Sequence, residues 1–105
     1  MTQEEIHEMM LEIGLPSAYE HFSENENPSL PFLIWSIEGE NTFSADNHMY
    51  YSSLQLNISL YNDEKSQETE AEVERVPKHH HIFYNKSETW IESEKLYEIL
   101  YEMEV

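Results

Sequence analysis

Apolar and polar residues alternate along residues 49–61, MYYSSLQLNISLY. The alternation predicts a strand with one face in a core, formed by Leu54, Leu56, Ile58 and Leu60. The opposite face carries neutral polar groups and tyrosines: Tyr51, Ser53, Gln55, Asn57, Ser59 and Tyr61. No position in this stretch is charged, although glutamate is frequent in the rest of the chain.

A second apolar segment precedes this strand. Residues 31–38, PFLIWSIE, present large apolar side chains on both faces, which is typical of a strand in the interior of a sheet. The polar stretch GENTFSADN, residues 39–47, predicts a loop that is longer than a tight hairpin requires. The charge-free strand then begins at about residue 48.

The C-terminal part of the chain predicts a hairpin of two strands, residues 80–93 and 94–105. Aromatic and aliphatic side chains occupy every second position of the last strand, at Tyr97, Ile99, Tyr101, Met103 and Val105. This period of two favours a strand. The apolar residues of 91–103 also show some helical spacing, so a helix is the alternative there.

Residues 2–15 predict a helix. Thr2 and Glu5 have the spacing of a capping box, and Gly14 followed by Pro16 ends the segment. Its apolar stripe has helical spacing and consists of Ile6, Met9, Met10 and Ile13. A helix packed on the sheet of its own chain explains this stripe more simply than a helix that binds a groove on another protein.

Residues 62–76 predict a second helix, capped by Asp63 or Ser66 and ended by Pro77. Its apolar stripe is thin and consists of Thr69, Val73 and Val76, so we expect this helix to lie on the surface. Residues 17–30 between the first helix and the first strand predict a polar connection.

The predicted order is α-β-β-α-β-β in a single domain, residues 1–105. This order indicates an α+β fold with a four-stranded, largely antiparallel sheet and both helices packed on one face. A chain of 105 residues is long enough to remove roughly 65% of its unfolded surface from water.

Charge narrows the possible partners. The chain has 22 acidic residues against 5 basic ones, a formal net charge of −17. Tight nucleic-acid binding and docking to an anionic membrane both need basic patches, so neither is expected. The longest strictly apolar run is far short of a membrane span, and the N-terminal residues lack the features of a secretory signal. No cysteine is present.

The sequence KHHHIFY is the only candidate metal site. Neighbouring histidines on an extended chain point to opposite faces, so only His79 and His81 could converge, with His48 and Asp46 as additional ligands. The spacing does not require a metal, and a histidine-rich connection exposed to water is the simpler interpretation. We therefore expect no metal and no other cofactor.

No catalytic residues are predicted. The carboxylate pairs lie in strongly polar stretches, whereas a general acid needs a pKa raised by burial. The chain contains neither a nucleophile elbow nor a glycine-rich phosphate loop. The expected class is a protein without enzymatic activity.

The neutral face of residues 49–61 predicts a subunit interface. Two like charges in contact repel by about 1 kcal/mol in water, and by more where water is partly excluded. A chain with a net charge of −17 therefore packs against another copy most easily where carboxylates are absent. The predicted interface residues are Tyr51, Ser53, Gln55, Asn57, Ser59 and Tyr61. The alternative is that a helix or loop of the same chain covers this face.

Several stretches resemble the short tail-completion, tail-terminator and head–tail joining proteins of long-tailed phages and prophages of Gram-positive bacteria. The resemblance spans about residues 14–105 and depends most on FSADNHMYY, on LYNDEKS and on TWIESEKLYEILYE. It implies an α/β subunit that assembles into a hexameric ring at the head-proximal end of the tail tube, where it ends tube polymerisation and binds the connector. The stretch VERVPKHHHIF departs from the family pattern, which has a leucine-ended helix and a polar turn there.

The resemblance also implies partners and a location. The partners are other copies of the chain, the tail tube protein and the connector, and the location is the host bacterial cytoplasm during assembly and then the virion. A ring of acidic subunits would repel phosphates, so DNA could pass through it without binding tightly.

Two other functions remain open at this point. An acidic regulatory protein or DNA mimic would occupy the basic groove of a partner protein, and the net charge permits this. A small metal-binding domain would use the histidine run.

Overall fold

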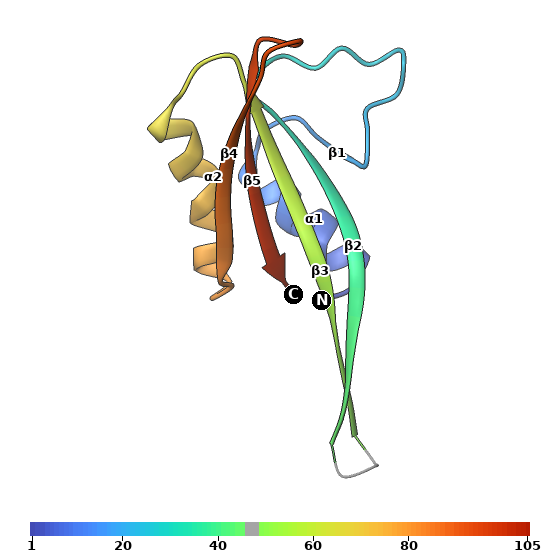
Figure 1. Ribbon diagram of the computed structural model, residues 1–105. Coiled ribbons are helices and arrows are strands. Elements are labelled where there is room, and N and C mark those ends of the chain that lie inside the picture. Colours follow the sequence, from blue (N-terminus) through green and yellow to red (C-terminus); the bar gives the residue numbers. More distant parts are fainter. Residues whose placement is uncertain (46–48) are drawn as a thin grey trace.

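The computed structural model describes residues 1–45 and 49–105, and all of their side chains except those of residues 43–45 and 49–51. Its elements are α1 (Gln3–Ile13), β1 (Ser17–Tyr19), β2 (Phe32–Ala45), β3 (Met49–Asn62), α2 (Gln67–His79), β4 (Tyr84–Ile91) and β5 (Leu96–Glu104) (Figure 1). The strands form one sheet in the order β1-β2-β3-β5-β4. β1 runs parallel to β2, and the other three pairings are antiparallel.

The α+β class is confirmed, but the sheet has five strands and not the predicted four. The additional strand is β1, which lies in the segment predicted to be a polar connection. β1 has three residues, too few to show a period of two. Long-range main-chain hydrogen bonds fix its place: Leu33 N–H donates to the Pro16 carbonyl and Glu20 N–H donates to the Trp35 carbonyl, both at 2.8 Å.

The first helix forms as its sequence predicts. The Thr2 hydroxyl accepts a hydrogen bond from the Glu5 N–H, and the Glu5 carboxylate accepts one from the Thr2 N–H. Gly14 ends the helix with φ = 87°, a left-handed conformation that favours glycine. All four residues of the predicted stripe are buried: Ile6, Met9, Met10 and Ile13.

The second helix starts later and ends later than predicted. Ser66 is its cap and accepts a hydrogen bond from the Thr69 N–H at 3.2 Å. The prediction that Pro77 ends the helix is wrong, because α2 continues to His79. Pro77 contributes no N–H, but its ring is buried, and the His80 N–H donates to the Val76 carbonyl at 3.1 Å. Burial of an apolar ring offsets one lost hydrogen bond near the end of a helix.

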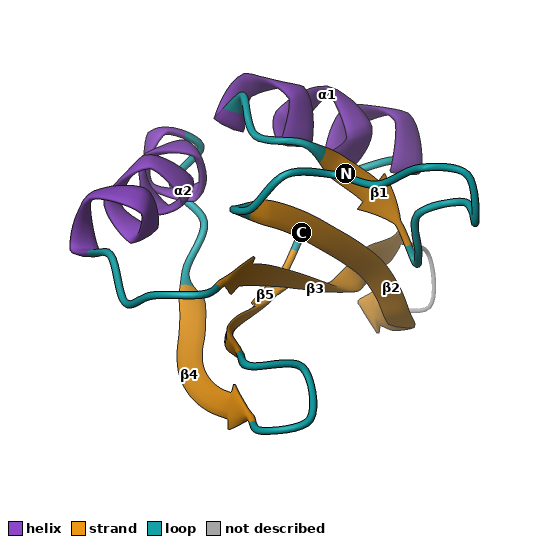
Figure 2. Ribbon diagram, turned by 90° about the horizontal axis from the view of Figure 1, so that it is seen from above, coloured by secondary structure: helices purple, strands orange, loops and turns teal. Residues whose placement is uncertain are grey.

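The hydrophobic core lies between the sheet and the two helices, which pack on the same face of the sheet (Figure 2). The helices contribute Ile6, Met9, Met10, Ile13, Val73 and Val76, and the strands contribute Leu33, Trp35, Leu56, Ile58, Leu60, Ile99, Tyr101 and Met103. The thin stripe of α2 is therefore sufficient to attach it, since Val73 and Val76 are both fully buried. α2 is exposed only on its outer side.

The β2–β3 hairpin extends well beyond the body of the molecule (Figure 1). β3 pairs with β5 only as far as Gln55 and Glu104, with a last pair of main-chain bonds between Leu54 and Val105. Beyond that point β2 and β3 pair only with each other, from Asn41 opposite Ser53 onward. We call residues 41–45 and 49–53 the arm. The molecule measures 50 × 29 × 25 Å.

The prediction of a loop at residues 39–47 is wrong for residues 39–45, which belong to β2. Residues 46 and 47 lie outside the described part of the chain. Gly39 lies next to a register shift in β2 and not in a turn. Residues 39–45 show no regular alternation between apolar and polar positions, although they pair with β3. A period of two in a sequence arises where one face of a strand is buried. The sequence of residues 39–45 lacks this period and therefore does not predict a strand.

The C-terminal hairpin is confirmed. β4 and β5 pair from Tyr84 opposite Met103 to Ile91 opposite Leu96, so a helix over 91–103 is wrong. The residues expected to begin the first of these strands, 80–83, form a turn and a short extended connection after α2.

Candidate interaction site on the open face of the sheet

One face of the sheet is not covered by either helix, and we call it the open face. The alternation of the strands assigns to it Phe32, Ile34 and Ser36 of β2, Ser53, Gln55, Asn57, Ser59 and Tyr61 of β3, and Glu98, Leu100, Glu102 and Glu104 of β5. Glu38 of β2 joins them at the register shift, where its carboxylate accepts a hydrogen bond from Ser36 Oγ at 2.5 Å. The five predicted interface residues with described side chains therefore lie together on one face.

The predicted residues of β3 are half-buried in the isolated chain, as expected for the middle of an uncovered sheet. The side chain of Tyr51 lies outside the described part of the chain. At one end of the open face, a connecting segment does provide partial cover: Phe22 contacts Phe32 at 5.4 Å between ring centroids, and Phe32 stacks on Tyr61 at 5.3 Å. The same chain therefore covers one end of the neutral face, at Phe32 and Tyr61.

The neighbouring strand β5 brings carboxylates to the edge of this surface. Tyr61 OH donates to Glu98 at 3.0 Å, Ser53 Oγ donates to Glu104 at 2.5 Å, and Asn41 Nδ2 donates to Glu104 at 3.0 Å. Some of the neutral groups of β3 therefore have an intramolecular role as hydrogen-bond donors. This role could not be predicted from the sequence, because the pairing of β3 with β5 is long-range.

These contacts shift two pKa values. The hydrogen bonds from Ser53 and then Asn41 lower the pKa of Glu104. Burial, followed by the hydrogen bond to Glu98, raises the pKa of Tyr61. Glu104 is thus held as a carboxylate and Tyr61 as a neutral donor.

The open face accordingly has two halves. The β2–β3 half, with the arm, carries no carboxylate from residue 41 to residue 45 or from residue 49 to residue 62, but Glu38 of β2 lies on it beside Ser36. The β5 half carries Glu98, Glu102 and Glu104. The expectation of a neutral surface holds for the described open-face residues of β3 and for Phe32, Ile34 and Ser36 of β2, which we call the neutral strip, and does not hold for the whole face.

Asn57 lies at the centre of the neutral strip. Its Oδ1 is buried and has no hydrogen-bond partner among the described residues. Its register neighbours are Ser36 on β2 and Glu102 on β5. An unsatisfied buried acceptor costs about 1–3 kcal/mol.

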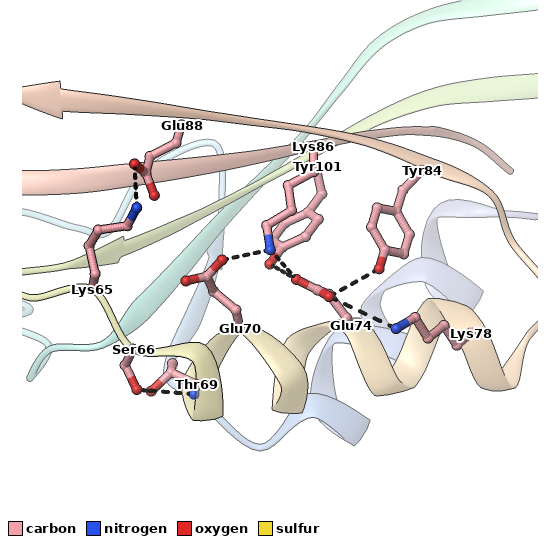
Figure 3. Close-up of polar contacts among 10 residues, drawn as sticks. All are labelled: Lys65, Ser66, Thr69, Glu70, Glu74, Lys78, Tyr84, Lys86, Glu88 and Tyr101. Carbon is pink, nitrogen blue, oxygen red and sulfur yellow. Dashed lines mark hydrogen bonds and ion pairs between the residues drawn. The ribbon is translucent and has the colours of Figure 1, made fainter.

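The opposite face holds the most connected polar cluster of the described chain, between α2, β4 and β5 (Figure 3). The Glu74 carboxylate accepts hydrogen bonds from Tyr84 OH at 3.1 Å, Lys86 Nζ at 2.7 Å and Tyr101 OH at 2.7 Å. Lys86 Nζ also lies 2.6 Å from Glu70. One turn of α2 is thereby attached to two strands.

The pKa values in this cluster indicate a structural role. Burial alone would raise the pKa of Glu74, but the hydrogen bonds from Lys86 and Tyr101 together bring it below the ordinary value. Burial would lower the pKa of Lys86, and its bonds to Glu70 and Glu74 instead raise it. Both groups stay charged, whereas a carboxylate that donates a proton in catalysis needs a raised pKa.

The histidine run does not gather as a metal site. His79 is the last residue of α2, His80 Nε2 lies 3.0 Å from Glu12 Oε2, and His81 has φ = 58° in the turn that follows. Within residues 1–45 and 49–105, no group of three or more potential ligands is close enough to hold a metal. His48 and Asp46, the other proposed ligands, lie outside the described residues.

Comparison with models of known protein families and with curated proteins finds no match to this chain. Among the described helices, neither has the length and apolar character needed to cross a membrane.

Proposed function

We propose that the chain is a virion-assembly subunit that packs against copies of itself through the neutral strip and the arm. The supporting observation is that residues 41–45 and 49–62, which include the arm and the β3 residues of the neutral strip, carry no charge in a chain with a net charge of −17. The proposed place of action is the tail terminator or head–tail joint of a long-tailed phage or prophage, on the strength of the sequence resemblance.

The arm supports self-assembly through its exposure. An isolated two-stranded ribbon is marginally stable in water, and the described arm has neither a third strand nor a helix against it. Its segments NTFSA and MYYSS contain no charged residue and include large apolar and aromatic side chains. Residues of this kind are typical of protein interfaces, and a second chain would supply the additional contacts that a two-stranded ribbon lacks.

Charge supports the same surface. Copies with a net charge of −17 repel one another wherever carboxylates meet. The neutral strip is wide enough for contact without that repulsion, and the serine, asparagine and glutamine side chains on it can hydrogen-bond across a contact. In the proposed hexameric ring, the acidic outer surfaces would face the DNA passage or the solvent and would repel phosphates.

Native mass spectrometry and negative-stain microscopy of the purified chain test the proposal. We expect association that rises with concentration and closed rings of one size, alone or with the tail tube protein and connector. The structure shows that glutamate at Gln55 or Asn57 would also face Glu104 or Glu102 within the same chain, so those substitutions alone do not isolate the contact between subunits.

Two results would contradict the proposal. A chain that stays monomeric with every such partner and competes with DNA for a basic protein would identify the acidic regulatory alternative. Tight, salt-sensitive binding to DNA in a filter assay would contradict the proposed passage of DNA past an acidic ring.

A further inference from the structure

Residues 75–87, RVPKHHHIFYNKS, are an exception to the acidity of the chain. They contain three of the five basic residues, three histidines and no carboxylate. The other two lysines are paired within the chain, Lys65 with Glu88 and Lys95 with Glu92. We call residues 75–84, at the end of α2 and the start of β4, the basic corner.

Two cations of the basic corner are not fully neutralised by carboxylates of their own chain. Arg75 donates to the Glu12 main-chain carbonyl at 3.2 Å, and none of the described carboxylates forms an ion pair with it. Lys78 Nζ lies 4.0 Å from Glu74, at the limit of an ion pair (Figure 3), and its side chain is 67% exposed. Lys86, by contrast, is fully engaged by Glu70 and Glu74.

An aromatic side chain projects from the same corner. Phe83 is 96% exposed, far more than a phenylalanine in a fold with space for it in the core. On one side it borders a groove of about 590 Å³ lined by Lys78, His81, Ile82, Phe83 and Tyr84. On the other side it borders a hollow of about 320 Å³ that reaches Gln55, Glu102 and Glu104 on the open face. The corner therefore meets the open face where the neutral strip borders the carboxylates of β5.

We propose that the basic corner docks an acidic surface of a second copy of this chain, with Phe83 as the apolar anchor. The proposal depends on the proposed self-assembly and names the second contact that it requires. Every copy offers carboxylates over most of its surface, so the basic corner is where two such copies attract rather than repel. Two different surfaces in contact make a head-to-tail interface, the kind that closes into rings.

Nucleic acid fits this corner less well. Two cations, one of them already 4.0 Å from Glu74, release few counterions from DNA on a chain of net charge −17. The field of the whole molecule also opposes the approach of phosphates.

The test places a photoreactive residue at the anchor. Phe83→p-benzoylphenylalanine is made in the full chain, and copies grown on ¹⁴N and ¹⁵N are mixed and irradiated. The matched control is Trp90→p-benzoylphenylalanine, because Trp90 is also an exposed aromatic residue, at 42%, but lies beside Glu92. Mass spectrometry then counts crosslinks that join a heavy copy to a light one.

We expect crosslinks from position 83 to enter aspartate- and glutamate-containing peptides of the other copy, at several times the yield from position 90. Lys78→Glu and high salt should each reduce this yield several-fold. Equal yields at the two positions, insensitivity to Lys78→Glu, or preferential crosslinking to added DNA would overturn the inference.

A second variant separates this inference from the proposed function. Phe83→Ser removes an exposed side chain and should leave folding intact. If the wild-type chain forms rings and Phe83→Ser forms them equally well, the basic corner is not a contact but self-assembly stands. If the wild-type chain forms no rings with any partner, the proposed function itself fails.

Discussion

The β2–β3 half of the molecule and the α2–β4–β5 half differ in how many carboxylates they carry and in what those carboxylates contact. Around β2 and β3, Glu38 is the one carboxylate on the described open face, and residues 41–45 and 49–53 of the arm carry none. Around α2, β4 and β5, carboxylates are kept and given partners: Glu74 has three hydrogen-bond donors, and Glu104 has two.

This difference suggests that one half of the molecule mainly stabilises the fold and that the other half mainly mediates association between copies. A carboxylate with donors in its own chain contributes to the fold and repels a second chain less than a bare one. A surface without carboxylates contributes little to the fold but allows close approach. We therefore expect changes in the α2–β4–β5 half to alter stability, and changes in the β2–β3 half to alter association.

Removal of the arm should have the largest effect. Replacing residues 41–53 with Asn-Gly joins Glu40 to Leu54, which already lie opposite each other, through a two-residue turn that suits hairpins. Because the arm lies outside the core, we expect the free energy of unfolding to change by less than about 1 kcal/mol and ring formation to be lost. Urea titration and native mass spectrometry measure the two. A shortened chain that still forms rings would show that the arm is not needed.

Loss of the Glu74 carboxylate should have the largest effect on stability. Glu74→Ala leaves Tyr101, Tyr84 and Lys86 without their shared acceptor, which we expect to cost about 2–3 kcal/mol of unfolding free energy. Glu72→Ala on the exposed side of the same helix is the control and should stay within about 0.5 kcal/mol of the wild type. Equal effects of the two substitutions in urea titration would show that the cluster does not stabilise the fold.

The same cluster predicts how stability depends on pH. The pKa of Glu74 is lowered from 4.5 in the folded chain, so the unfolded chain takes up its proton first as pH falls. Its contribution is full above about pH 4.5 and is lost as pH falls through the lower folded value. Urea midpoints measured from pH 7 downward should therefore converge for the wild type and Glu74→Gln. A constant difference across that range would contradict this explanation.

The boundary between the two halves should show the smallest effect. Ser53 and Glu104 are hydrogen-bonded at 2.5 Å on an exposed surface, where water competes for the same groups. A double-mutant cycle of Ser53→Ala and Glu104→Gln should give a coupling of about 0.5 kcal/mol or less. A coupling above about 1 kcal/mol would mean that the neutral strip serves mainly to stabilise its own chain.

The elements that could be predicted from the sequence are those whose sequence pattern lies within the element itself. The first helix carries its own start and end at Thr2, Glu5 and Gly14, and β3 and β5 show their buried faces directly as a period of two. The α+β class follows from these elements.

The errors arose where long-range contacts decide the structure. β1 exists because three residues happen to reach the free edge of β2. Residues 39–45 carry no period of two that would mark them as a strand, and the pairing of Glu74 with Lys86 joins elements that are separate in sequence.

The candidate site was predicted only in part. The side chains of Ser53, Gln55, Asn57, Ser59 and Tyr61 do share the open face. The nearby Glu98 and Glu104 were missed because the register between β3 and β5 cannot be read from either strand alone. Phe83 was missed because IFY resembles the beginning of a strand, although the absence of acidic residues from 75 to 87 was visible in the sequence.

The central claim is that the neutral strip is where copies of the chain meet, and one pair of variants tests it most directly. Ser59 on β3 and Ser87 on β4 both lie beside Leu100 on the open face, but only Ser59 belongs to the neutral strip. Sedimentation equilibrium would compare Ser59→Glu with Ser87→Glu, after urea titration has shown that both variants fold. We predict that Ser59→Glu weakens self-association at least about tenfold, which corresponds to about 1.4 kcal/mol, whereas Ser87→Glu leaves it unchanged. Equal association of both variants and the wild type would contradict the claim.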